Sequence, residues 1–223
     1  MTSKYDPLSD PPLNQLPIDL WQQSQDVVQR CLEHSFIREM ACGNLSRHIY
    51  DRYVAQDVIF LRTYVTALSV GINHCLQSAK LTEFLSAALH EAVLELDMKQ
   101  IEAKNRAIPD YYFRALSATT DFGNFLIRAA QTHEISILMA ATLPCVQLYS
   151  YLGQELSRNL SNGVPHPYEA WISNNAGWST KRIATEWESR FSEFVSDTPE
   201  VRKTYRMALE HELKFFNASY YGK

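Results

Sequence analysis

The sequence predicts an all-α protein, folded as a single-domain bundle of about eight helices. Apolar residues recur three and four positions apart over long stretches, the spacing that places them on one face of a helix. Only 7 glycines and 9 prolines interrupt the 223 residues, fewer than a many-stranded sheet with tight turns needs. Hydrophobic residues make up 46% of the chain and charged residues 21%, as in an ordinary globular protein with one core.

The N-terminal residues 1–17 are expected to form an extended, proline-rich lead-in. They contain four of the nine prolines, and proline both lacks an amide hydrogen and restricts the residue before it. No linker-like segment follows, so residues 18–223 are predicted to form one helical domain.

Helical spacing and capping residues define the expected elements. A first helix is predicted at about 18–34, and a second runs from a cap at Asn44 or Ser46 to about Leu76. Residues 161–167, SNGVPHP, predict a turn. The remaining helices are expected at about 81–106, 112–131, 135–160, 168–174, 180–195 and 200–219.

The charge balance and the apolar segments exclude several classes of partner. Net charge is -4, with 21 basic and 25 acidic residues, so no nucleic-acid partner is expected. No apolar run approaches the roughly 20 residues of a membrane span, and the N-terminus lacks the charged-then-apolar pattern of a signal peptide. A cytoplasmic protein is therefore expected, whose four cysteines lack CxxC spacing and are reduced thiols.

The common cofactor and metal motifs are missing from the sequence. There is no GxGxxG or GxxxxGK phosphate loop and no GxSxG nucleophile elbow. None of the seven histidines has a glutamate three residues before it, so the Glu-x-x-His pair of di-iron bundles is absent. The sequence therefore predicts neither a metal nor a cofactor.

One face of the second predicted helix carries a carboxylate among aromatic residues. Tyr53, Asp57, Phe60 and Tyr64 follow one another at spacings of four, three and four. An apolar site would raise the pKa of Asp57, whereas a bound cationic or amino group would favour its charged form. A ligand site and an aspartate hydrogen-bonded to a neighbouring helix both fit, and the spacing alone slightly favours the second.

A thiol and a phenol share one face of the most apolar predicted helix. Pro144 lies inside this helix, where a lost hydrogen bond and a clash with the carbonyl of Ala140 predict a kink. Cys145 follows directly and Tyr149 lies one turn later, an arrangement that suits a positioned nucleophile. A buried cysteine that acts as a small hydrophobic residue would give the same pattern.

The last predicted helix also combines a carboxyl group with aromatic residues. Glu212 stands near Phe215, Phe216 and Ser219. A carboxyl group on an aromatic face suits a general acid with a raised pKa. A surface glutamate with the aromatic rings on the other side of the helix has the same spacing, so both interpretations stay open.

Four segments, taken in order, resemble blocks of the thiaminase II (TenA) family. They are HSFIREMACGNLSRHIYDRYVAQDVIFL at 34–61, LPCVQLYSYLG at 143–153, HPYEAWI at 166–172 and EHELKFFNASY at 210–220. The likeness spans nearly the whole chain from about Trp21. It implies a helical fold like that of heme oxygenase, without heme, and assembly as a homo-oligomer, a tetramer.

The resemblance also implies an activity and the residues that perform it. The family hydrolyses an aminomethyl-aminopyrimidine to the hydroxymethyl-pyrimidine and ammonia in thiamin salvage, and often cleaves thiamin itself. Its nucleophilic cysteine falls on Cys145, its substrate-holding aspartate on Asp57 and its proton-transferring glutamate on Glu212. These residues are expected to converge with Tyr53 and Tyr149 on one enclosed pocket for a pyrimidine.

Three positions depart from the family pattern. Phe60, Phe122 and Asn175 stand where the family often has tyrosines. Losing these hydroxyls changes which polar groups of a ligand can be satisfied, and such changes discriminate between ligands by large factors. The identity of the substrate therefore stays open. The predicted substrate-binding residues are Tyr53, Phe60, Tyr64, Phe122, Tyr149 and Asn175.

Three other functions remain open at this point. A divergent relative could bind or hydrolyse another amine-bearing heterocycle. The missing Glu-x-x-His pair disfavours a metal-dependent oxidase on the same scaffold. The retention of both Cys145 and Glu212 disfavours a non-catalytic binding or regulatory protein.

Overall fold

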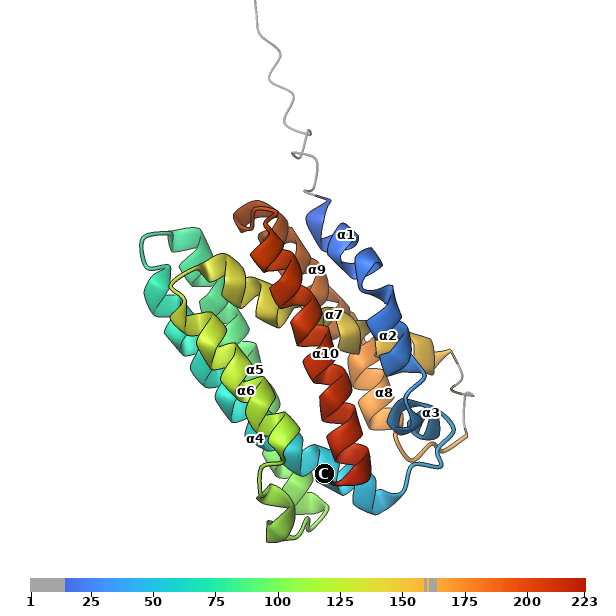
Figure 1. The fold of residues 1–223 in the computed structure, drawn as a ribbon. Coiled ribbons are helices and arrows are strands. Elements are labelled where there is room, and N and C mark those ends of the chain that lie inside the picture. Colours follow the sequence, from blue (N-terminus) through green and yellow to red (C-terminus); the bar gives the residue numbers. More distant parts are fainter. Residues whose placement is uncertain (1–14, 159, 161–163) are drawn as a thin grey trace, which may run out of the picture.

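The computed structural model describes residues 15–158, 160 and 164–223. Within these ranges the chain forms ten α-helices and one short 3-10 helix, with no strand (Figure 1), so the predicted all-α fold is confirmed. The helices are α1 (Leu16–Gln23), α2 (Gln25–Leu32), α3 (Ser35–Ala41), α4 (Arg47–His74), α5 (Ala79–Asn105), α6 (Ser117–Gln131), α7 (Ile135–Ser157), α8 (Glu169–Ala176), α9 (Trp178–Phe194) and α10 (Pro199–Tyr221), with the 3-10 helix η1 (Asp110–Phe113) between α5 and α6.

The expected number of about eight helices is too low because of the N-terminal end. The predicted helix at 18–34 is two helices, since Ser24 leaves the helical conformation and its amide bonds the carbonyl of Trp21 at 3.2 Å. The sequence pattern also does not predict α3. This helix is capped by His34, whose ring nitrogen Nδ1 accepts the amide of Phe36 at 3.1 Å.

The expected lead-in at 1–17 overlaps the first helix. Residues 1–14 lie outside the described residues, and Leu16 and Pro17 already belong to α1, because proline is tolerated in the first turn of a helix. Helix α7 ends at Ser157 instead of near residue 160. Residues 161–163 of the predicted turn also lie outside the described ranges.

A buried glutamine explains why α6 starts later than predicted. The helix expected at 112–131 begins only at Ser117. The segment before it is fixed to α4 by the side chain of Gln56, whose amide uses its full hydrogen-bonding capacity at distances of 2.7–2.9 Å. The partners are the carbonyls of Tyr112 and Arg114, the amide of Leu116 and the hydroxyl of Thr119.

The two helices that carry the predicted carboxyl groups have clear boundaries. Helix α4 begins after Ser46, one of the two expected caps, although this serine makes no side-chain cap hydrogen bond. Helix α10 begins at Pro199, and the hydroxyl of Thr198 accepts the amide of Val201 at 3.2 Å. It ends before Gly222, whose φ of 75° is a left-handed conformation that glycine adopts without strain.

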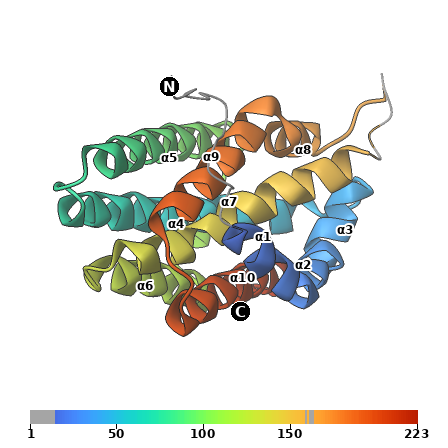
Figure 2. The same ribbon diagram turned by 90° about the horizontal axis from the view of Figure 1, so that it is seen from above.

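Helix α7 lies in the middle of the bundle (Figure 2). It packs against α6, α8, α9 and α10, while α4, α5 and α6 pack together on one side. By length and composition α7 is the one helix of the described chain that could cross a membrane, so its apolar stretch is longer than expected. However, 67% of its most apolar 18-residue stretch is buried inside the protein, as in a core helix. The helix thereby carries Cys145 and Tyr149 into the interior.

Helices α7 and α8 approach each other closely at Gly153. A Cβ atom added there would lie 2.3 Å from the backbone carbon of Asn175 and 2.4 Å from the backbone nitrogen of Ala176. These backbone atoms cannot rotate away as a flexible side chain would. Glycine at this position therefore lets α8, which carries Trp171, lie directly on α7.

We expect Gly153→Ala to destabilise the protein by about 1–3 kcal/mol, the usual cost of overpacking, even though alanine favours a helix. The matched control is Gly71→Ala, where the added methyl group would meet the movable Cδ2 end of Leu138 and should cost less. Thermal unfolding followed by circular dichroism measures both. A Gly153→Ala protein as stable as the parent would contradict the close helix contact.

Candidate active site

A thiol, a phenol and a buried carboxyl group meet at the centre of the bundle. Cys145 and Tyr149 of α7 are half-buried, whereas Glu212 of α10 is only 1% exposed. The Cys145 thiol and the Tyr149 hydroxyl both lie near the Glu212 carboxyl group, and both lower its pKa because they can offer it a proton. Its oxygen Oε1 nevertheless lacks a direct hydrogen-bond partner in the described part of the chain. A buried acceptor of this kind needs an explanation, and a ligand atom would supply one.

The protonation of this group follows from its burial. Burial raises the pKa of the Glu212 carboxyl to about 8, against the opposing effect of the Cys145 donor. Burial also raises the pKa of the Cys145 thiol well above its usual range, and the neighbouring Glu212 raises it further. The thiol is therefore protonated at rest. A carboxylate whose pKa lies near neutrality is well suited to accept that proton.

Asp57 belongs to a buried ion pair that the sequence pattern did not predict. Nζ of Lys99 on α5 lies 3.1 Å from Oδ2 of Asp57 and 5.3 Å from the centre of the Tyr53 ring. Burial raises the pKa of Asp57, and the ammonium of Lys99 opposes that rise. Burial disfavours the charged form of Lys99, but Tyr53 and Asp57 hold the Lys99 pKa well above its usual range. The aspartate is thus satisfied by a neighbouring helix and also faces the candidate site.

Glu95 reaches the same site from a more open position on α5. Its charge raises the pKa of both Cys145 and Glu212, yet its own side chain is exposed. Partial desolvation of the carboxyl group, followed by the charge of Asp57, raises the pKa of Glu95 to about 7. Glu95 therefore marks the solvent side of the site. Lys99 follows Glu95 by four residues and Glu102 follows Lys99 by three, so the three side chains share one helical face, which is the sequence signal for this wall.

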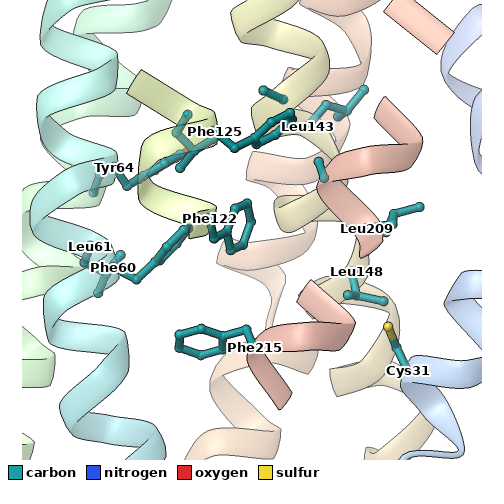
Figure 3. Close-up of a cluster of buried hydrophobic side chains, with 14 of the residues drawn as sticks. Cys31, Phe60, Leu61, Tyr64, Phe122, Phe125, Leu143, Leu148, Leu209 and Phe215 are labelled. Carbon is teal, nitrogen blue, oxygen red and sulfur yellow. The ribbon is translucent and has the colours of Figure 1, made fainter. Parts of the chain in front are cut away.

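Aromatic rings from three helices form another wall of the site. The ring centre of Phe60 on α4 lies 4.6 Å from that of Phe122 on α6 and 6.0 Å from that of Phe215 on α10. The three side chains point toward one another (Figure 3). Tyr64 stacks on Phe60 at 6.0 Å. Burial raises the pKa of the Tyr64 hydroxyl well above its usual range, and the nearby Cys145 raises it further, so Tyr64 lies on the thiol side of this wall.

Tyr53 connects the site to α8. Its hydroxyl donates to the hydroxyl of Tyr149 at 3.5 Å and accepts from the indole nitrogen of Trp171 at 3.2 Å. Sequence reasoning did not single out Trp171, whose signal is its place in the HPYEAWI segment. Asn175 lies one turn after Trp171 on α8, and its side-chain amide donates to the backbone carbonyl of Trp171 at 2.8 Å.

The arrangement joins the components of nucleophilic catalysis. It contains a thiol, a buried carboxyl group, an ion pair and an aromatic wall, groups that can serve as nucleophile, base and binding surface. Across residues 15–158, 160 and 164–223, no group of three or more His, Cys, Asp or Glu side chains is placed to hold a metal ion. The four cysteines are free thiols in the structure.

The fold and the site together describe an all-α protein whose central site pairs a thiol with a buried carboxyl group. The chain belongs to the TENA/THI-4/PQQC family, whose model matches residues 21–222. The resemblance to TenA proteins seen in the four sequence segments is thereby confirmed. The match also extends over the helices that carry every residue of the candidate site.

Curated relatives fall into two kinds. The chain is 24% identical over 220 residues to the aminopyrimidine aminohydrolase of Helicobacter pylori, covering 90% of this chain and 96% of the relative. It is 27% identical over 204 residues to the thiamine biosynthesis multifunctional protein ThiED of Corynebacterium efficiens, covering 89% of this chain. It spans only 27% of that protein, and 38% of the bifunctional TH2 protein of Arabidopsis thaliana.

Solved structures show the same fold. A TenA homologue from Pyrococcus horikoshii OT3 superimposes with a TM-score of 0.84 at 17% identity, over 93% of this chain and 99% of the other. A TenA homologue from Pyrococcus furiosus gives 0.82 at 16% identity, over 92% and 99%. The bundle is therefore the TenA architecture, reached with few identical residues.

We expect Glu212→Gln to change how stability depends on pH. The folded-state pKa of Glu212 is raised from 4.5 to about 8. Its contribution to stability is therefore fully present below pH 4.5 and is lost as pH rises through about 8. Each unit of this shift corresponds to about 1.4 kcal/mol. Between these limits the parent should lose stability relative to the glutamine variant, as measured by Tm at successive pH values; parallel pH profiles would contradict the raised pKa.

Proposed function

We propose that this chain is a hydrolase that converts an aminomethyl-aminopyrimidine and water into a hydroxymethyl-pyrimidine and ammonia, in thiamin salvage. The observation that carries the proposal is the half-buried Cys145 thiol facing Glu212, a base whose pKa lies at about 8. The similarity to aminopyrimidine aminohydrolases of Helicobacter pylori and Bacillus subtilis supports the substrate class.

The chemistry begins with transfer of the Cys145 proton to Glu212. The thiolate adds to the electron-poor pyrimidine ring, and the displaced electron pair expels the exocyclic amine, which leaves as ammonia with the proton from Glu212. Water then adds to the exocyclic carbon and gives a proton to Glu212. The carbon–sulfur bond breaks and the thiolate regains this proton. A pKa near 8 lets one carboxyl group accept and return each proton.

The ion pair on α4 and α5 supports recognition of the pyrimidine edge. An aminopyrimidine presents an amino donor next to a ring-nitrogen acceptor. The Asp57 carboxylate suits the amino group, and the Lys99 ammonium, 3.1 Å away, suits the acceptor. Phe60 and Phe122 offer apolar faces to the ring. The hydroxyls of Tyr53 and Tyr149, 3.5 Å apart, are polar groups of the same site.

The same site favours one second candidate, hydrolysis of a related amine-bearing heterocycle. Phe60 and Phe122 remove hydroxyls that the family often has at these positions. The Lys99 ammonium lies 3.1 Å from the Asp57 carboxylate and is a donor at this edge of the site. A ring with an additional acceptor, such as a carbonyl oxygen, would match this combination of fewer hydroxyls and an ammonium donor.

We also propose that the chain works in the cytoplasm as a homotetramer. Helix α5 exposes apolar side chains in a stripe, with Leu94, Met98 and Ile101 spaced four and three residues apart. A second copy of the chain would remove this stripe from water. The number of four subunits rests on the resemblance to TenA proteins.

We expect Cys145→Ala to abolish ammonia release from the aminopyrimidine while the helical content stays that of the parent, because only a small half-buried side chain is lost. Cys42→Ala is the matched control: it removes an exposed thiol outside the site and should keep parent activity. Ammonia release and circular dichroism measure the two effects. Full hydrolysis by Cys145→Ala would mean that the thiol is not the nucleophile.

We expect light scattering to give about four times the chain mass of 25.6 kDa. Met98→Lys should shift the protein toward smaller species, because it places a charge in the exposed stripe of α5. Leu76→Lys changes an equally exposed apolar residue beyond α4 and should leave the mass unchanged. A parent protein with the mass of one chain would overturn the proposed assembly.

A further inference from the structure

Three side chains that can hydrogen-bond follow one another from α8 toward the buried carboxyl group of α10. The indole nitrogen of Trp171 donates to the hydroxyl of Tyr53 at 3.2 Å. The Tyr53 hydroxyl donates to that of Tyr149 at 3.5 Å. Tyr149 in turn packs on Phe216, one turn along α10 from Glu212, with ring centres 6.1 Å apart, which places its hydroxyl beside the Glu212 carboxyl group. Trp171 and Tyr53 are both buried, so water does not compete for the first link. We call this the Trp171–Glu212 chain.

The indole fixes the direction of the Trp171–Glu212 chain. An indole N–H has one proton to donate and no lone pair with which to accept. The Tyr53 hydroxyl must therefore accept from Trp171, which leaves its own proton for Tyr149. Tyr149 accepts that bond and turns its own proton to Glu212. Both hydroxyl dipoles then point toward the carboxyl group, and links of this kind strengthen one another in a low-dielectric interior.

The other titratable groups around Glu212 make these donors important. None of those groups is a cation that could pair directly with an ionised carboxylate, and the Lys99 ammonium is already paired with Asp57. Hydrogen-bond donors are therefore what favours the ionised form of Glu212. The groups that face it are Cys145 and Tyr149 of α7, Asp57 and Tyr64 of α4, Glu95 of α5 and Cys31 of α2.

We propose that Trp171 is a positioning residue: its indole N–H orients the hydroxyls of Tyr53 and Tyr149 so that Tyr149 presents its proton to the Glu212 carboxyl group. No bond to Trp171 is made or broken. The inference rests on the proposed function for its consequence in catalysis, because it concerns the base that accepts the Cys145 proton.

Trp171→Phe tests the proposal, since it removes the N–H donor and keeps an aromatic ring. Without that donor the Tyr53 hydroxyl can turn its proton away from Tyr149, and ionised Glu212 loses support. We expect the Glu212 carboxyl to titrate about one pH unit higher. Carbon-13 NMR of this carboxyl resonance, assigned by its absence from Glu212→Gln, measures the shift without turnover. The acidic limb of the pH profile of kcat/KM for the aminopyrimidine should move to higher pH by the same amount. At pH values below this limb, kcat/KM should fall about tenfold.

Two further variants make the test specific. Tyr53→Phe breaks the chain at its next link and should raise the Glu212 titration similarly, and the double variant should add nothing, as expected for residues acting in one chain. Trp187→Phe is the matched control, because this indole is also buried but packs on Phe84 with ring centres 4.8 Å apart. It should leave the Glu212 titration at the parent pH.

An unchanged Glu212 titration in Trp171→Phe and Tyr53→Phe overturns the proposal. If Trp171→Phe does not fold, Tyr53→Phe decides alone: a shift supports the chain and its absence refutes it. The two proposals can fail separately. If the parent releases no ammonia from the aminopyrimidine but Trp171→Phe and Tyr53→Phe raise the Glu212 titration, the proposed function is refuted and the inference is supported. If the parent hydrolyses the aminopyrimidine but neither variant shifts the Glu212 titration, the inference is refuted and the proposed function is supported.

Discussion

The burial of carboxyl groups inside an apolar bundle is the constraint on which this structure depends. An ionised carboxylate in the interior is costly unless it is paired, hydrogen-bonded or protonated. The protein uses a different solution for each of three neighbouring groups. Asp57 pairs with Lys99 at 3.1 Å, Glu95 stays exposed to water, and Glu212 has its pKa raised to about 8. The helices α4, α5 and α10 must lie where they do for these solutions to coexist.

The reactivity of the site comes from the same constraint. Burial raises the pKa of both the Cys145 thiol and the Glu212 carboxyl group, so both groups carry their protons at neutral pH. In the proposed mechanism the thiolate forms only when Glu212 is ionised and accepts the thiol proton, because the raised pKa otherwise keeps the sulfur protonated and unreactive. The central position of α7 makes this possible, because it surrounds the thiol with helices while leaving it half-buried.

The sequence predicts the local features of the protein better than those that depend on distant partners. Periodicity is enough for the long helices and for the shared face of Tyr53 and Asp57, since both depend on neighbours within a few turns. The partnership of Asp57 with Lys99 joins residues on different helices, and no spacing encodes it. Only the family resemblance indicated that Glu212 faces inward. The spacing of its aromatic neighbours fits a buried glutamate and a surface glutamate equally well.

The side chain of Gln56 has a consequence for how the molecule opens. It joins α4 to backbone groups 56 to 60 residues further along the chain, and each of its hydrogen-bonding positions is occupied. The connection between η1 and α6 cannot detach without leaving a buried amide unsatisfied. This irregular segment therefore belongs to the same cooperative unfolding unit as α4, and fluctuations of the native state that expose it must also disturb the helix that carries Asp57.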